Sequence, residues 1–141
     1  TMLYRQAGSP KAAKSSPFTD VTDSWSVDAV NWAFEKGVVN GTSPTTFSPN
    51  DAITRQDMAT ILYNYTRNVL DLDVYDTADL TGYPDYSSIS DYARTPLSWA
   101  VAQGVILGVG NSNGVDTLQP KGDATRAQTA TIIMRFCQNV L

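Results

Sequence analysis

The sequence predicts a mainly α-helical protein built from tandem helix–loop–helix repeats, and three observations carry this prediction. Two stretches, residues 18–67 and 83–138, share the same landmarks in the same order. In each stretch, apolar residues recur at helical spacing on both sides of a loop rich in Gly, Pro, Asn and Asp. Strand signal is confined to the short runs 38–39 and 105–106, which predict at most a small β-bridge.

The repeat is defined by landmarks that keep their order, and a third trace of it stands at the start of the chain. Thr1–Tyr4 matches Thr60–Tyr63, so the chain is expected to open inside the last helix of an earlier repeat. The other matches are Phe18-Thr19-Asp20 with Tyr83-Pro84-Asp85, Trp32-Ala33 with Trp99-Ala100, Gly37–Gly41 with Gly104–Gly108, Phe47-Ser48-Pro49 with Leu118-Gln119-Pro120, and Thr54-Arg55 with Thr125-Arg126.

These matches divide the chain into five parts. They are the end of a preceding truncated repeat (1–10), a linker rich in Pro, Ser and Ala (11–17), repeat one (18–69), an acidic linker (70–82) and repeat two (83–141). A helix pair of about 50 residues buries little surface alone, so repeats gain stability by packing on their neighbours. The grooves between neighbours are therefore expected to be the binding sites.

The first helix of repeat one is predicted over residues 25–36. Asp23 or Ser24 can cap its start, and Gly37 stands where a left-handed glycine ends a helix. Val27, Val30 and Phe34 fall on one face, and the mid-helix tryptophans Trp32 and Trp99 are expected in the core.

The second helix of each repeat is predicted to open at Thr54 and at Thr125. Thr54 is followed by Asp57 at the third helical position, and Thr125 by Gln128, which completes a capping box. Cys137 is expected to be a small buried side chain of the second stripe. The apolar stripes are Met58/Ile61/Leu62/Tyr65 and Thr129/Ile132/Ile133/Phe136.

Composition excludes several classes of function. The chain has no histidine and one cysteine, which removes histidine catalysis, histidine zinc sites and internal disulfides. Its net charge of −4 leaves no basic footprint for nucleic acid, and no apolar run approaches the roughly 20 residues of a membrane span. The acidic linker fails the EF-hand pattern because Asp76 stands where that loop needs glycine, so a solvated loop is expected, with no metal or cofactor.

The ordered landmarks F-x-D, W-A, G-V-V-x-G, F-x-P and I-T-R resemble the S-layer homology (SLH) repeat over residues 18–67 and 83–138. The resemblance implies three repeats packed as a pseudo-threefold prism. It also implies that the chain is extracellular, at the cell wall or S-layer of a Gram-positive bacterium. There it would anchor a surface protein to secondary cell-wall polysaccharide, which often carries pyruvylated N-acetylmannosamine.

Carried over position by position, the family's T-R-A-E motif falls on residues 54–57 and 125–128, with Asp57 and Gln128 replacing its glutamate. Repeat two offers Tyr92 in the region of Trp25, and its loop after Gly108 departs from the family in length and sequence. The ligand-binding residues that the resemblance implies are Asp20, Trp25, Gly41, Thr42, Thr54, Arg55, Asp85, Gly108, Thr125 and Arg126.

The chemistry of these residue types suits an acidic glycan. Arg55 and Arg126 would stand at helix starts, where unsatisfied N–H groups and a guanidinium together bind the carboxylate of a pyruvate ketal. Trp25 offers a flat face to a sugar ring, and Asp20 can accept from sugar hydroxyls. Each residue also has a plain structural reading: the arginines can pair with nearby aspartates, and the aspartates and glycines can serve turns.

Three functions can be weighed against these observations, and two of them stay open. The first is non-enzymatic anchoring by polysaccharide binding. The second is protein–protein assembly with other surface-layer proteins, kept open by the departures in repeat two and by the tyrosines Tyr75, Tyr83 and Tyr86. A glycosidase with two catalytic aspartates is not expected, since it would need a carboxylate pair fixed across a deep cleft.

Overall fold

The computed structural model describes residues 1–110, 114 and 116–141, and it is mainly helical, as predicted. Two short 3₁₀ helices, η1 and η2, lead into α4, and none of the described helices is long and apolar enough to cross a membrane. The elements in chain order are α1 (Met2–Gln6), α2 (Ser24–Glu35), α3 (Arg55–Asn68), η1 (Tyr86–Ser88), η2 (Asp91–Ala93), α4 (Arg94–Ala102), β1 (Val109–Gly110), β2 (Asp116–Thr117) and α5 (Arg126–Asn139).

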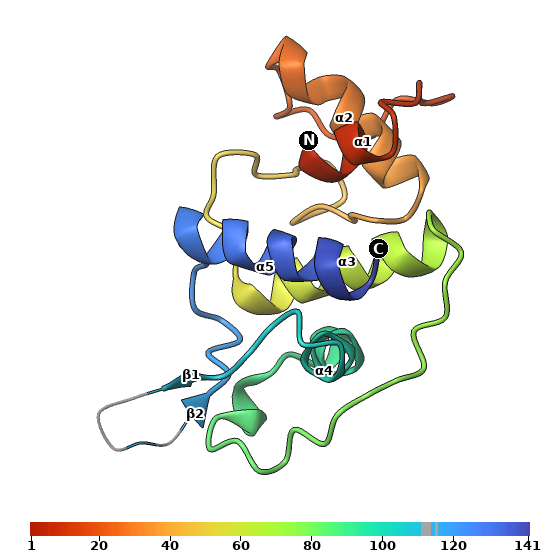
Figure 1. The fold of residues 1–141 in the computed structure, drawn as a ribbon. Helices are drawn as coiled ribbons and strands as arrows, with labels where there is room; N and C mark the ends of the chain where they lie inside the picture. The colour runs from red at the N-terminus through yellow and green to blue at the C-terminus, as the bar shows by residue number, and fades with distance from the viewer. Residues whose placement is uncertain (111–113, 115) are drawn as a thin grey trace.

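Helices α3 and α4 pack against each other, and an aromatic contact of the same kind joins α1 to α2. Tyr4 of α1 lies 5.6 Å from Trp32 of α2, and Tyr63 of α3 lies 5.8 Å from Trp99 of α4, between ring centroids. Both tryptophans are buried, as predicted. Figure 1 shows α1 against α2 at one end of the molecule and α4, seen end-on, beside α3.

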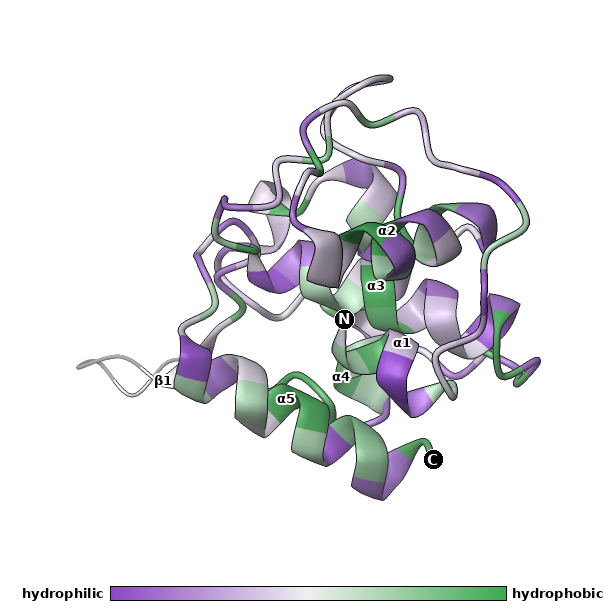
Figure 2. Cartoon of the chain, turned by 90° about the horizontal axis from the view of Figure 1, so that it is seen from above, coloured by the Kyte–Doolittle hydropathy of each residue, from purple (hydrophilic) through white to green (hydrophobic). Residues whose placement is uncertain are grey.

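Helices α1, α3 and α5 meet through equivalent positions of the repeat. The Tyr65 hydroxyl donates to the Gln6 side chain, and the rings of Tyr65 and Phe136 lie 6.1 Å apart. Apolar residues run along α3 through the middle of the molecule and along the side of α5 (Figure 2). The pseudo-threefold prism stays a prediction.

Each loop between the two helices of a repeat is held by an aspartate. Asp20 accepts hydrogen bonds from the backbone N–H groups of Phe47 and Ser48 at 2.9 and 2.8 Å, and Asp85 makes the same pair of bonds with residues 118–119. The second residue of each pair has a left-handed backbone, with φ of 59° and 49°. The two bonds stabilise a conformation that costs free energy in a residue other than glycine.

The two short runs with strand signal stay within the predicted limit of a small β-bridge, since neither forms one. Residues 38–39 and 105–106 form no strand, because they follow a helix end and their side chains pack inward as loop. The described strands lie in the longer loop of repeat two, where Val109 pairs with Thr117 in antiparallel register. In the acidic linker the aspartates are exposed, as expected, while Val74 and Leu80 are buried and tie the linker to the core.

The prediction that Cys137 is buried was wrong. Its thiol is exposed, because α5 buries the side of Ile132 and Phe136 while Cys137 and the half-exposed Met134 lie outside that stripe. The buried stripe of α5 therefore holds fewer residues than the apolar pattern of the sequence indicated.

The Asp20 bonds predict an acid-dependent stability. They lower the pKa of Asp20 from its ordinary value of 3.8, chiefly through the Phe47 N–H and then the Ser48 N–H. The stabilisation is therefore present at neutral pH and is lost as the pH falls from about that value through the lowered pKa. We expect Asp20→Asn to lower the thermal midpoint at pH 7, measured by circular dichroism, and to reduce the loss of midpoint between pH 5 and pH 2. The exposed Asp76→Asn is the control, and equal midpoints for the two variants at pH 7 would contradict the proposed role.

Candidate functional site

A groove in repeat one, lined by both polar and apolar side chains, includes two of the predicted residues. This repeat-one groove has a volume of about 790 Å³ and lies between residues 38–53 and the outer side of α3. Such a volume falls in the range of small-ligand sites. Its polar lining consists of Asn40, Thr42, Ser48, Asp51, Asp57, Thr60, Asn64 and Tyr92.

Gly41 and Thr42 form part of the groove wall, and both are also constrained by the loop. Gly41 has φ of 83°, and an added Cβ would lie 2.3 Å from the Phe18 ring and 2.7 Å from the Thr46 carbonyl oxygen. The Thr42 hydroxyl lies 2.7 Å from that of Ser48 and 3.3 Å from the Thr46 carbonyl oxygen. Glycine is therefore needed at position 41 for the packing of the loop.

Two aromatic residues line this groove, Phe47 of repeat one and Tyr92 of the next repeat. Tyr92 is 59% exposed, and its hydroxyl donates to the Asp57 carboxylate. Burial of the hydroxyl and this bond raise the pKa of Tyr92 to about 12. Sequence reasoning placed Tyr92 in the region of Trp25 but did not select it as a binding residue. The sequence did not show that this side chain lines the groove of the preceding repeat, because that position depends on how the repeats pack.

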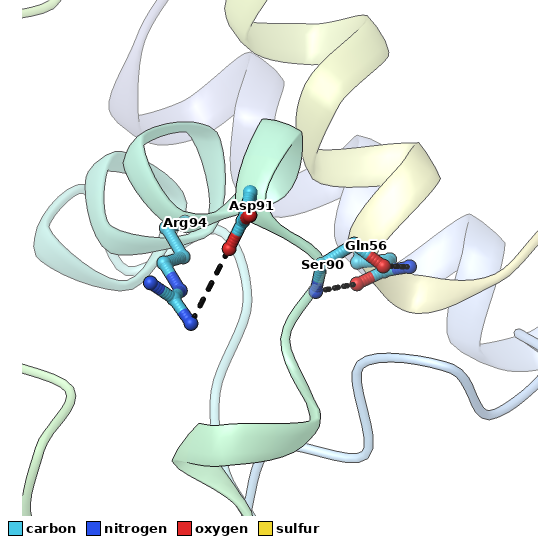
Figure 3. A network of polar contacts seen from close by, with 4 residues as sticks. All are labelled: Gln56, Ser90, Asp91 and Arg94. Carbon is cyan, nitrogen blue, oxygen red and sulfur yellow. Dashed lines mark hydrogen bonds and ion pairs between the residues drawn. The ribbon is translucent and has the colours of Figure 1, made fainter.

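Gln56 holds this part of repeat two in place (Figure 3). Its side chain is 4% exposed; it donates to the Ser90 hydroxyl at 3.0 Å and accepts from the Ser90 backbone N–H at 3.1 Å. It also donates to the Tyr92 hydroxyl at 3.3 Å. An exposed ion pair between Arg94 and Asp91, 3.4 Å long, follows on the next turn. The position of Tyr92 thus depends on a buried amide of repeat one.

Arg55 binds repeat two rather than facing the groove. It is 5% exposed, and its guanidinium donates to the carbonyl oxygens of Leu118 at 2.9 Å and Leu107 at 2.7 Å. Burial lowers the pKa of Arg55, nearby Arg135 lowers it further, and Asp85 raises it. Arginine stays charged in such an environment, so the two carbonyls satisfy a buried cation.

The N–H groups at the start of α3 are occupied as well. Arg55 donates its backbone N–H to the Gly122 carbonyl at 3.0 Å, Gln56 donates to that of Pro120 at 2.9 Å, and the third N–H is capped by the Thr54 hydroxyl. An open anion site was expected here; the geometry gives no support to Thr54 or Arg55 as ligand contacts.

The start of α5 is different. Thr125 and Gln128 form the predicted capping box, with bonds of 3.1 and 3.0 Å. Arg126 is exposed, and the backbone N–H groups of Arg126 and Ala127 have no hydrogen-bond partner among the described residues. This end retains the features expected of an anion site.

The other predicted residues lie elsewhere. Asp20 and Asp85 use both carboxylate oxygens on their loops. Trp25 is 67% exposed and lines an adjoining, mostly apolar pocket of about 330 Å³ with residues of α1 and α5. Gly108 packs beside Asp116, and the segment of repeat two that departs from the family includes residues outside the described ones. Of the ten predicted residues, the repeat-one groove is lined by Gly41 and Thr42.

The structure is a helical module built from repeats with a groove of ligand size, and comparison with known proteins identifies its family. The family model of the S-layer homology domain matches residues 17–59 and 82–130. The chain is 35% identical over 124 residues to the Surface-layer 125 kDa protein of Lysinibacillus sphaericus, covering 87% of this chain and 10% of that protein. It is 34% identical over 135 residues to an endoglucanase of Bacillus sp. strain KSM-635, covering 94% and 13%.

A third relative, S-layer protein sap of Bacillus anthracis, is 31% identical over 128 residues, covering 89% of this chain and 14% of that protein. The chain belongs to the S-layer homology domain family. It spans about a tenth of the length of the relatives it matches. Domains of this family are non-catalytic modules that anchor proteins to the cell envelope and bind cell-wall polymers, which places the chain at the cell surface.

The buried guanidinium predicts a large stability effect. Arg55→Ala leaves two carbonyls without donors and opens a void between the repeats, so we expect a loss of about 2–4 kcal/mol in the free energy of unfolding, measured by urea titration. Arg55→Lys, which cannot reach both carbonyls with a planar fork, should recover only part of it. The matched control Arg126→Ala should change stability by less than about 0.5 kcal/mol. Equal losses for Arg55→Ala and Arg126→Ala would contradict the interface role.

Proposed function

We propose that this chain anchors a surface protein non-covalently to the envelope by binding a secondary cell-wall polysaccharide in the repeat-one groove. The observation that carries the proposal is the composition of the groove. An exposed aromatic ring, Tyr92, stands beside hydroxyl and amide groups such as those of Thr42 and Asn64. Aromatic faces pack on the apolar faces of sugar rings, and amides and hydroxyls exchange hydrogen bonds with sugar hydroxyls.

Recognition of a pyruvate ketal on that polymer is the second part of the proposal. Arg126 is the residue suited to it, since its side chain is exposed and the backbone N–H groups of residues 126 and 127 have no hydrogen-bond partner among the described residues. An arginine binds a carboxylate through two parallel hydrogen bonds, and the helix start adds partial positive charge. Thr125 shapes this end through its capping box.

The domain organisation of the sequence completes the proposal. Residues 18–69 and 83–141 act as two repeats joined by the acidic linker, and residues 1–10 contribute the end of another. Three such repeats would close into the prism, in which each junction resembles the one between α3 and α4. The Tyr4–Trp32 and Tyr63–Trp99 contacts support that arrangement.

Protein–protein assembly is a second candidate, favoured by one observation. Arg55, the repeat-one equivalent of Arg126, binds the carbonyls of a loop in the following repeat. Arg126 could bind the loop of another SLH repeat in the same manner. Under this alternative, Arg126→Ala would abolish concentration-dependent association in sedimentation velocity and leave wall binding unchanged.

Co-sedimentation with purified Gram-positive walls tests the anchoring function. Thr60→Trp places a large ring in the repeat-one groove and should reduce the bound fraction at least tenfold, because the sugar is excluded sterically. Ser87→Trp, an exposed site that does not line the groove, is the matched control and should bind like the parent. Circular dichroism verifies that both variants fold. Undiminished binding by folded Thr60→Trp would refute the groove as the site.

Walls stripped of pyruvate ketals test the role of Arg126. We expect the parent to bind native walls better than stripped walls and Arg126→Ala to lose that difference, since one charge-assisted pair contributes about 1.5–3 kcal/mol. A ketal preference that survives Arg126→Ala would contradict this assignment.

A further inference from the structure

We infer that the repeat-one groove selects an uncharged sugar of the wall polymer and disfavours one that carries a carboxylate. This inference rests on the proposed function and specifies which part of the polysaccharide the groove takes. It departs from the sequence-based expectation of an arginine-anchored acidic sugar in this repeat, and the reason lies in where the structure puts the charges.

Among the residues that the structure describes, two carboxylates and no basic side chain line the groove. Asp51 is exposed at the loop side, and Asp57 is half-buried on α3, where it accepts the Tyr92 hydroxyl. Neither carboxylate forms an ion pair with a described residue. A ketal carboxylate bound between them would meet two like charges at short range, which the low-dielectric walls of a groove do not screen well.

The cations that the sequence offered for this site are engaged elsewhere. The Arg55 guanidinium is buried against the Leu107 and Leu118 carbonyls, and the N–H groups at the start of α3 bond to residues 120–122. The basic residue at the far end of α3, Arg67, lies over the Tyr63 ring at 5.5 Å and bonds to Asn68. Neither arginine lines the groove.

Repeat two shows that these charges are particular to repeat one. At the positions of Asp57 and Asn64 it carries Gln128 and Arg135, so the equivalent face of α5 has lost an acid and gained a base. The helix framework is shared, and the side chains of the two faces differ in the sign of charge. The repeats are therefore suited to different sugars of the polymer.

The lining fits an uncharged sugar. Tyr92 presents a ring that is 59% exposed, while its pKa of about 12 keeps the hydroxyl protonated at neutral pH. Asp57 and Asp51 have oxygens that accept hydrogen bonds from sugar hydroxyls. Asn64, which makes one long bond of 3.4 Å to the Val38 carbonyl, supplies an amide to the same cavity.

Titration calorimetry with two polymers, native wall polysaccharide and the same polysaccharide stripped of pyruvate ketals, tests the inference. The parent for this test is the Arg126→Ala chain, which removes the proposed ketal contact outside the groove. We expect it to bind the stripped polymer about three- to tenfold more tightly than the native one. Adding Asn64→Arg, the repeat-two residue, should reverse that preference, whereas the control Asp76→Asn should leave it unchanged.

The possible outcomes distinguish failure of this inference from failure of the proposed polysaccharide binding in the groove. Tighter binding of the native polymer by Arg126→Ala, abolished by Thr60→Trp, would overturn the inference and leave groove binding intact. Equal binding of both polymers that Asn64→Arg does not alter would also overturn it. Binding of either polymer that Thr60→Trp does not weaken would refute the groove itself.

Discussion

The bond between Arg55 and the carbonyls of Leu107 and Leu118 is the constraint on which the arrangement of the two repeats depends. It joins a charged side chain of repeat one to the backbone of repeat two, and neighbouring N–H groups of α3 extend it to residues 120–122. A buried guanidinium is costly unless its donors are satisfied, so the loop must sit where its carbonyls meet it. The two repeats are therefore fixed relative to each other by polar geometry as well as by apolar packing.

The groove is a consequence of that junction. Gln56 follows Arg55 on α3. The start of this helix therefore binds the repeat-two loop through Arg55 and hydrogen-bonds to Ser90 and Tyr92 through Gln56. The groove of repeat one thus takes its exposed aromatic side chain, Tyr92, from repeat two. The groove is accordingly formed at a junction between repeats, and a single isolated repeat would lack one of its walls.

The sequence predicted the helical repeat, the capping of α3 and α5, and the buried tryptophans, because these follow from local periodicity and capping chemistry. It did not predict that Arg55 would be buried. A Thr-Arg pair at a helix start has the same sequence whether the arginine binds a ligand or a neighbouring loop. It likewise could not assign Tyr92 to the groove, since that assignment needs the packing of one repeat on another. The prediction that Cys137 is buried was wrong for a related reason: the width of the buried stripe on a helix depends on the helix that packs against it.

One helical framework carries two charge patterns. The loop clamps of Asp20 and Asp85 and the aromatic contacts at the two junctions repeat closely, so the backbone constrains those positions. The outward positions of α3 and α5 are free of such constraint, and there the repeats diverge, with Asn64 in one and Arg135 in the other. A repeat protein can thereby keep one backbone while the charges on the outward faces of its helices differ from repeat to repeat.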